Sequence, residues 1–444
     1  MKKRLWFSLH GFLGVTAGLV LFVICWSGTV ATIADELDWV VTPELRIAES
    51  TTEVRWNRVH ATLQESTEPE WIDSVHVPMN PYAAVRAEIE PPEQPEYLVY
   101  LHPRTGEKLG EFSELTIQEF FRGLHRHLFL PKPTGIVLVS LFAIALLIMA
   151  ISALMFLKRW WVRFLQLRLF TRQGHIAWGD LHRTAGLWSL WFVILMAVIG
   201  IWYGLEATGI PDALLEPDQE PAALTEAALS SEPLPLGTLV ARAQAARPQL
   251  EIREVEWEHD KAGIGLVRVQ GQAQDWLVRD RVNYVSLTQD GRLMNTGSGS
   301  DLSAYAYWVN MADPLHFGSF AGLPTKFLWF GFGLILCGII LTGTWLHARR
   351  LARHPKGPSK LRWPGTMPAC AASLILLAMA VPFGIAEMRA YGALGGATEP
   401  AVGAPIGVVT FITAWLALTI TIIACWLFLL WRPVPPGAAR MRGH

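Results

Sequence analysis

Four of the 13 histidines recur at equivalent positions of an internal repeat. SLHGFLG around His10 aligns with DLHRTAG around His182, and GLHRHLFLPKPT around His125 aligns with PLHFGSFAGLPT around His316. The first two lie at one end of long apolar segments, and the other two immediately precede such segments. An imidazole near a bilayer is costly and usually has an assigned partner. Two neutral imidazoles from neighbouring helices are what bis-axial ligation of a haem iron requires, so the repeat predicts two ligand pairs.

Glycines near these histidines favour the same interpretation. Gly14 and Gly186 follow His10 and His182 by one helical turn, where they would leave room for a flat macrocycle on the same helix face. The alternative is that the histidines only bond lipid headgroups and that the glycines serve helix packing. His127 is a second candidate ligand in place of His125.

Basic residues lie close to the four histidines. Carboxylates at a membrane edge need cationic partners, so these side chains could pair with haem propionates. They could equally anchor lipid headgroups. The candidates are Arg122, Arg126 and Lys132 around His125, Arg183 beside His182, and Lys326 after His316.

The elements that must position these residues are membrane helices. Of the 444 residues, 52% are hydrophobic and only 17% charged, and the apolar residues gather in six blocks. Because about 20 apolar residues span a bilayer, the sequence predicts a polytopic α-helical membrane protein with about six transmembrane helices. Lys and Arg flank the blocks at ends that the positive-inside rule assigns to the cytoplasm, with both termini inside. A net charge of -1 and no zinc-finger spacing exclude nucleic-acid binding.

Two polar segments separate the blocks, and each predicts a small α+β domain. WNRVHATLQE and LGTLVARAQAA are typical of helices, and alternating runs that predict strands follow each. In the second segment these runs are IREVEWEH, IGLVRVQ, DWLVRDRV and NYVSLTQDGRLMNTG. Together with the histidine repeat, this order indicates a duplicated unit of helix, external domain and helix. A Pro/Glu-rich linker is predicted over 216–235.

The predicted boundaries follow this duplication. Transmembrane helices are expected at 1–34, 133–158, 181–206, 325–348, 367–388 and 404–431. External domains are expected at 35–132 and 207–324, and cytoplasmic loops at 159–180 and 349–366.

At LHGFLG, FFRGLHRHLFLP, LHRTAGLW and DPLHFGSFAGLPTKFLWFGFGL the chain resembles the PepSY-associated transmembrane helix family of bacterial inner-membrane proteins. The resemblance covers about residues 1–350, so the last two helices lie outside it. It implies two periplasmic PepSY-like domains and two noncovalent haem b groups. It also implies that His10 and His182 ligate a cytoplasmic-side haem, and His125 and His316 a periplasmic-side haem.

Some members of this family are ferric-siderophore reductases, which sets the functional expectation. We expect a multi-pass inner-membrane oxidoreductase, in contact with membrane lipid, that passes electrons to a ferric siderophore in the periplasm. Reduction releases the metal because hard oxygen ligands favour Fe(III). No flavin or nicotinamide motif is recognisable, so the donor would be a separate cytoplasmic reductase or a quinol. One alternative is a haem-free protein whose PepSY-like domains bind or inhibit a periplasmic partner, and another is di-haem transfer to a different acceptor.

Overall fold

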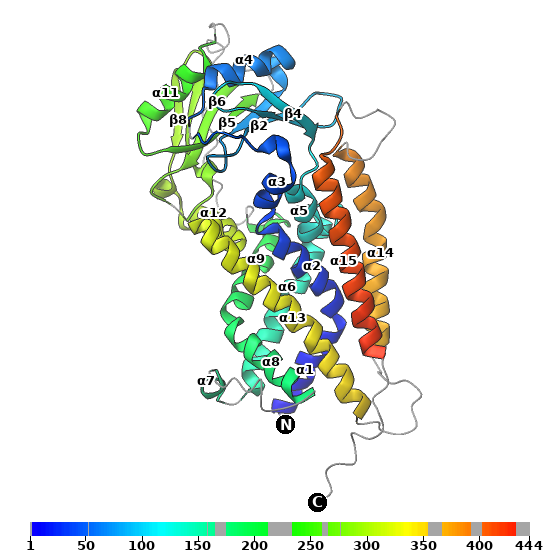
Figure 1. Ribbon diagram of the computed structural model, residues 1–444. Helices are drawn as coiled ribbons and strands as arrows, with labels where there is room; N and C mark the ends of the chain where they lie inside the picture. The colour runs from blue at the N-terminus through cyan, green and yellow to red at the C-terminus, as the bar shows by residue number, and fades with distance from the viewer. Residues whose placement is uncertain are drawn as a thin grey trace, which may run out of the picture.

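A sheet domain sits at one end of a bundle of long helices, and the N-terminus lies at the other end (Figure 1). The computed structural model describes residues 2–51, 53–157, 159–164, 175–211, 233–259, 265–275, 277–353, 366–391 and 402–431. Nearly all of the linker predicted over 216–235, and much of both predicted cytoplasmic loops, lie outside these residues.

Long apolar helices make the chain a polytopic membrane protein. Two more candidate spans are bent helix pairs, so the described residues hold four spans, or six if each pair counts as one. The straight helices are α6 (Thr134–Phe156), α13 (Leu323–Arg353), α14 (Thr366–Ala390) and α15 (Ile406–Trp431). The bent pairs are α1 (Lys2–Thr16) with α2 (Gly18–Ala31), and α8 (His175–Trp188) with α9 (Leu190–Glu206).

The bends correct the prediction of one continuous helix in each of these two places. The angles are 67° between α1 and α2 and 62° between α8 and α9. The breaks, at Ala17 and Ser189, are equivalent in the repeat. At the first break, the hydroxyl of Thr344 donates to the carbonyl of Gly14 (2.8 Å) and so competes for a helix acceptor. At the second, the hydroxyl of Ser189 donates to the carbonyl of Ala185 (2.8 Å), a back-bond that often bends helices.

The two polar segments form one continuous eight-stranded antiparallel sheet, with the order β4-β3-β2-β1-β5-β6-β7-β8. The sequence predicted a separate small sheet in each segment, and the pairing of β1 with β5 joins them. DWLVRDRV is not a strand, because its described end forms a 3₁₀ turn at Asp280–Val282. The strands are β1 (Ile72–His76), β2 (Val85–Ile89), β3 (Tyr97–Leu101), β4 (Lys108–Ser113), β5 (Glu251–His259), β6 (Gly265–Gln272), β7 (Asn283–Thr288) and β8 (Leu293–Gly297).

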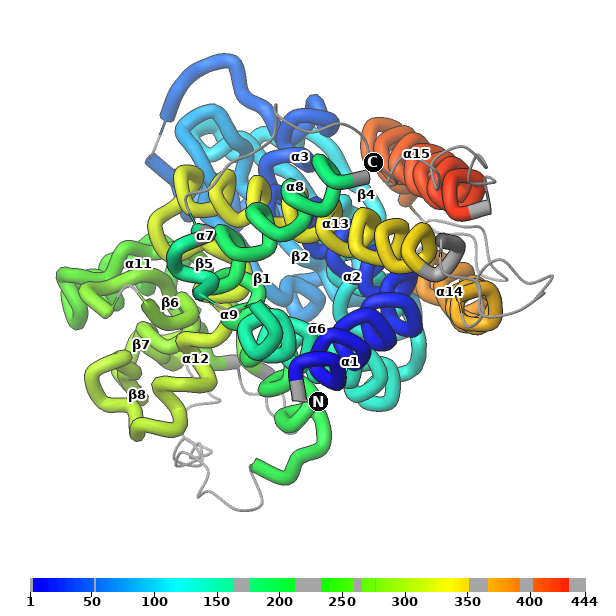
Figure 2. Tube along the Cα trace, turned by 90° about the horizontal axis from the view of Figure 1, so that it is seen from below, coloured from blue at the N-terminus to red at the C-terminus, as the bar shows by residue number. Residues whose placement is uncertain are grey.

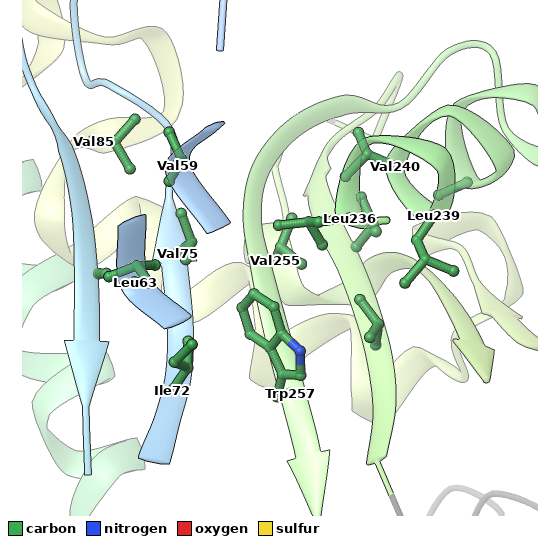
Figure 3. Close-up of a cluster of buried hydrophobic side chains, with 14 of the residues drawn as sticks. Val59, Leu63, Ile72, Val75, Val85, Leu236, Leu239, Val240, Val255 and Trp257 are labelled. Carbon is green, nitrogen blue, oxygen red and sulfur yellow. The ribbon is translucent and has the colours of Figure 1, made fainter. Parts of the chain in front are cut away.

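One hydrophobic core runs across the junction of β1 and β5. Two helices cover the same face of the sheet, α4 (Trp56–Ser66) over the first half and α11 (Leu236–Ala246) over the second. Val75 of β1 pairs directly with Val255 of β5, and both side chains are fully buried. Antiparallel pairing of equivalent strands relates the halves by an approximate twofold axis through this pair. Figure 3 shows the side chains of both halves in this core, among them Val59, Leu63, Leu236, Leu239 and Trp257.

Short helices connect the sheet to the membrane bundle. They are α3 (Ala34–Val41), α5 (Ile117–His127) and α12 (Ala304–Phe317), and α7 (Trp160–Arg163) lies near the opposite end. The carboxylate of Asp38 in α3 accepts hydrogen bonds from the backbone N–H groups of Ile117 (2.7 Å) and Gln118 (3.1 Å). This bond pair caps the start of α5 and fixes its position relative to α3.

Candidate functional site

The first histidine pair, His125 of α5 and His316 of α12, lies where the bundle meets the sheet domain. The two ring centroids are 5.8 Å apart, with 37° between the planes. Both rings line a cavity of about 660 Å³ that extends between α2, α6, α9 and α13. We call these two residues the sheet-side pair.

The second pair, His10 of α1 and His182 of α8, lies toward the opposite end of the bundle. Its ring centroids are 6.5 Å apart and its planes are inclined by 80°. We call it the far pair. As the repeat predicted, each pair takes one histidine from each half of the duplication, and the structure brings together the partners that the resemblance implied.

The spacing within both pairs fits a metal held between two imidazoles. Two metal–nitrogen bonds of about 2 Å, with about 1.1 Å from each nitrogen to its ring centroid, place the centroids roughly 6 Å apart. Among the described residues, no three or more His, Cys, Asp and Glu side chains gather as a metal site. Two protein ligands are nevertheless sufficient for a haem iron, because the macrocycle supplies the other four.

Hydrogen bonds prepare three of the four rings for ligation. His125 Nδ1 donates to the carbonyl of Ile24 (2.7 Å), and His10 Nδ1 donates to that of Met149 (3.0 Å). His182 Nδ1 lies 3.2 Å from the hydroxyl of Thr342, whose own hydrogen is donated to Gly338. Since these oxygens act as acceptors, Nδ1 carries the hydrogen and Nε2 of the neutral ring is free to bind a metal. Ligating histidines commonly have such a second bond.

The fourth ring, that of His316, lacks this bond. Its Nδ1 atom is buried and has no hydrogen-bond partner. In the repeat, the counterpart of Ile24 is Met196, which lies in the wall of the same cavity. Burial, and next the neighbouring His125, lower the pKa of His316 to about 3, so the ring is neutral near pH 7.

A missing side chain makes room for His125. A Cβ atom added to Gly28 of α2 would lie 2.5 Å from the ring of His125, so only glycine fits there without a shift. On the far side, a Cβ on Gly343 of α13 would lie 2.9 Å from the ring of His182. The sequence does not reveal either glycine as part of a site, because each contact arises between distant segments.

Cations from both halves line the cavity near the sheet domain. Arg122 and Arg126, four residues apart on the exposed face of α5, line it together with Lys132. The fold adds Arg279 and Arg281 from the 3₁₀ turn that replaced the predicted strand. Arg279 is paired with Asp313 (2.6 Å) and Arg122 with Glu119 (3.5 Å), and the carboxylates of Glu206 and Asp313 line the same cavity. The five cations still outnumber these two lining carboxylates, which favours an anion in this part of the cavity.

Tyr203, Asp313 and Arg279 form a polar network beside His316. The hydroxyl of Tyr203 donates to Asp313 (2.6 Å), and Arg279 forms an ion pair with the same carboxylate (2.6 Å). Burial raises the pKa of Asp313, but the bond and charge of Arg279 outweigh it and hold the pKa below its usual range. The ring of Tyr203 meets the ring of His316 edge to face, with centroids 5.3 Å apart. The partners of Asp313 come from distant segments, so the sequence alone does not reveal this network.

Two of the cations predicted to bind propionates, Lys326 and Arg183, form ion pairs with acidic side chains of the protein. Lys326 forms ion pairs with Asp35 (3.1 Å) and Glu36 (2.9 Å) and is not among the residues of the cavity wall. Arg183 pairs with Asp180 (2.8 Å). The geometry therefore gives both cations acidic protein partners.

His127 lies outside the sheet-side pair, and the two predicted glycines, Gly14 and Gly186, lie on the helices of the far pair. His127 is buried, and its Nδ1 lies 2.9 Å from the carbonyl of Leu130. Since His125 is the ring that faces His316, His127 is the weaker candidate. A Cβ on Gly186 would meet open space, whereas one on Gly14 would touch Met149 at 3.7 Å.

One further histidine lies near the far pair. A Cβ on Gly11, the neighbour of His10, would lie 2.5 Å from Nδ1 of His347, and Arg350 lies 3.2 Å from the same nitrogen. The structure half-buries His347 against α1, a contact between segments that are far apart in the sequence.

Comparison with known proteins agrees with this architecture. A family model described as the PepSY-associated TM region matches residues 7–350. The chain is also similar to an uncharacterized protein of Pseudomonas aeruginosa, with 26% identity over 284 residues, which are 58% of this chain and 71% of that relative. The matched family region contains both histidine pairs and the sheet domain, and it ends before α14.

Proposed function

Because the chain belongs to the family of PepSY-associated transmembrane regions, we propose that it is a membrane electron-transfer protein that holds a haem b group at each histidine pair. One observation carries this proposal. In each of the two pairs the imidazole centroids lie at a spacing compatible with a shared metal, and three of the four rings already have one nitrogen hydrogen-bonded within the protein. Histidines that only formed hydrogen bonds with lipid headgroups would not be expected to lie in pairs inside the protein.

Particular residues would hold each group. His125 and His316 would be the axial ligands on the sheet side, with Gly28 leaving space for the ring of His125. Arg122 and Arg126 would bind the propionates. His10 and His182 would be the axial ligands on the far side. The haem would supply one-electron transfer, and the protein would supply ligands, spacing and exclusion of water.

The acceptor that we propose is a ferric siderophore on the periplasmic side of the bacterial inner membrane. A large polar chelate cannot enter the hydrocarbon core, so it would dock at the sheet domain, close to the sheet-side pair. The donor, a cytoplasmic reductase or a quinol, would act nearer the far pair. The position of the cavity at the sheet end supports placing one haem close to this docking site.

The visible spectrum and haem content of the detergent-purified protein test the haem proposal. We expect the bands of a low-spin b-type haem and two haems per chain. A colourless protein that cannot be reconstituted with haem would overturn the proposal. That result would favour a membrane protein whose sheet domain binds a periplasmic partner.

A second experiment tests the acceptor. After chemical reduction of the purified protein, ferric siderophores should reoxidise the haem, and a ferrous chelator should capture the iron. If the haem stays reduced with every ferric complex but is oxidised by another periplasmic acceptor, the siderophore assignment fails and the electron-transfer proposal stands.

A further inference from the structure

The last two helices, α14 and α15, follow the region that the family model matches. They lie together on one side of the bundle in both views (Figures 1 and 2). α15 contacts α3, α5 and α13, whereas α14 contacts α1 and α2. The added helices therefore reach the helix that carries His125.

An aromatic cluster makes the contact between α15 and the sheet-side pair. Trp415 of α15 is buried, with 5% of its surface exposed. Its ring stacks on Trp26 of α2 (6.0 Å between centroids, 17° between planes) and meets the edge of Phe121 of α5 (4.7 Å, 88°). The indole N–H of Trp26 also donates to the hydroxyl of Thr419 on α15 (2.9 Å). We call Trp26, Phe121 and Trp415 the aromatic clamp.

The clamp joins the two helices that set the position of His125. Trp26 lies between Ile24, whose carbonyl accepts the hydrogen of His125 Nδ1, and Gly28, which lies against the same ring. Phe121 is one helical turn before His125 on α5. If α5 moved away from α2, the 2.7 Å bond between His125 and Ile24 would lengthen and the ring would be free to rotate.

We infer that Trp415 is a positioning residue for His125, and that α15 thereby holds one of the two imidazoles of the sheet-side pair in its orientation. The clamp takes Trp26 from α2 and Phe121 from α5, so it acts directly on the His125 side of the pair. His316 is flanked instead by Tyr203 and Asp313. The geometry of the clamp is independent of any cofactor, whereas its effect on a haem rests on the function proposed above.

The test compares two tryptophans of the same helix in the full-length protein. Trp415→Ala removes the clamp. Trp426→Ala is the matched control, because Trp426 is buried to a similar extent (6% exposed) but packs at the other end of α15, where its indole N–H donates to Leu341 of α13 (3.0 Å). Trp415→Phe keeps an aromatic ring at the clamp and should restore the wild-type behaviour.

Two measurements are made on each variant. Hydrogen–deuterium exchange in detergent needs no cofactor, and we expect exchange in α5 to rise about tenfold or more in Trp415→Ala but to stay unchanged in Trp426→Ala. In the haem-loaded protein, Trp415→Ala should shift the midpoint potential and the electron paramagnetic resonance signal of one haem only. That haem should be the one lost in His125→Ala.

The outcomes separate the inference from the proposed function. Unchanged exchange in α5 of Trp415→Ala, or an equal rise in Trp426→Ala, would overturn the positioning role. Increased α5 exchange in a protein that never binds haem would retain the positioning role and reject the haem. Should Trp415→Ala fail to fold, Phe121→Leu removes the edge contact from the α5 side, with the same expected results.

Discussion

At the scale of single residues, the second nitrogen of each histidine distinguishes the four rings. His10, His125 and His182 have it bonded within the protein, and His316 does not. A ring with a bonded Nδ1 is held in one tautomer and orientation, so binding a metal costs it little ordering. The ring of His316 is not held by such a bond. Its orientation should therefore change more than that of the other three rings when haem binds.

The unbonded nitrogen of His316 leads to a structural prediction. In the haem-loaded protein, His316 Nδ1 should donate to the carbonyl of Met196, which is the repeat counterpart of the bond between His125 and Ile24. A buried donor without a partner costs roughly 1–3 kcal/mol, so the bond should form once the ring is fixed. A structure of the loaded protein checks this, and a His316 ring bonded instead to Asp313 would contradict it.

Replacement of the ligands should remove haem one site at a time. His10→Ala or His182→Ala should each remove one haem, and His125→Ala or His316→Ala should each remove the other, because the pairs lie at opposite ends of the bundle. Haem content and the redox titration of each variant measure this. His127→Ala is the control and should retain both haems. Loss of the same haem in the His10 and His125 variants would contradict the pairing.

Asp38 should make stability depend on pH. Burial raises its pKa to about 7, the bonds from Ile117 and Gln118 oppose this shift, Asp35 adds to it and Arg86 opposes it. The folded state therefore binds the proton more tightly than the unfolded state, whose carboxyl titrates near its usual value of about 4. Stability should fall as pH rises from about 4 to about 7, and this contribution should be constant above that range.

The check is the midpoint of thermal unfolding in detergent between pH 4 and 8. Asp38→Asn cannot ionise, so its midpoint should decline less over this range than that of the wild type. An equal decline in both proteins would show that Asp38 does not titrate with folding. At a single pH near 5, Asp38→Ala should lose about 0.5–2 kcal/mol, the usual cost of a lost helix cap.

At the scale of elements, the sequence predicted local structure well and contacts between distant segments poorly. Alternation and helical periodicity located α4, α11 and the strands β5, β6, β7 and β8 in their observed segments, since these depend on neighbouring residues. The bends after Thr16 and Trp188 were missed, because one of them depends on a bond from Thr344. The junction of β1 and β5 could not be predicted from either polar segment alone.

The residues of the candidate site likewise fall into those that the sequence reveals and those that only the fold brings together. The histidine pairs could be found because the duplication repeats their surroundings in the sequence. Gly28, Tyr203, Arg279 and His347 carry no such signal, since each reaches its site only through the fold. Lys326 was chosen for its proximity to His316 in the sequence, and its ion pairs with α3 likewise carry no signal in the sequence.

The junction between the two halves of the sheet can be tested with a double-mutant cycle. Val75→Ala and Val255→Ala should each cost about 2 kcal/mol in the free energy of unfolding, because each removes buried methyl groups. As directly paired residues they should also couple by about 0.5 kcal/mol or more. Val75 and Val285, three strands apart, form the control pair and should be additive. Additivity in both pairs would indicate that the halves do not share a core in solution.

At the scale of the whole molecule, the two histidine pairs lie toward opposite ends of helices that cross a bilayer core about 30 Å thick. If each pair holds a haem, as proposed, one haem alone could exchange electrons with only one side. A route across the membrane therefore needs both pairs. Loss of the far pair should impair electron transfer only when the donor and the acceptor are on different sides of the membrane.

Sealed vesicles provide that test. His10→Ala and His182→Ala should still reduce a ferric acceptor after chemical reduction of the purified protein, because the sheet-side pair remains. In vesicles with the donor confined to the far side, the same variants should fail. His125→Ala and His316→Ala should fail in both assays. Transfer across the vesicle membrane by a far-pair variant would contradict the two-step route.

The twofold relation through Val75 and Val255 has a consequence for the origin of the protein. A chain containing only the first half would carry one histidine for each pair and a sheet that ends in an unpaired β1 edge. Such an edge is a template for another strand, and a twofold axis allows two identical β1 strands to pair with each other. Two copies of that half would complete the sheet and bring together both pairs of histidines. The duplicated protein is thus, in its architecture, a homodimer whose subunits have become joined in one chain, with α14 and α15 as an addition that breaks its symmetry.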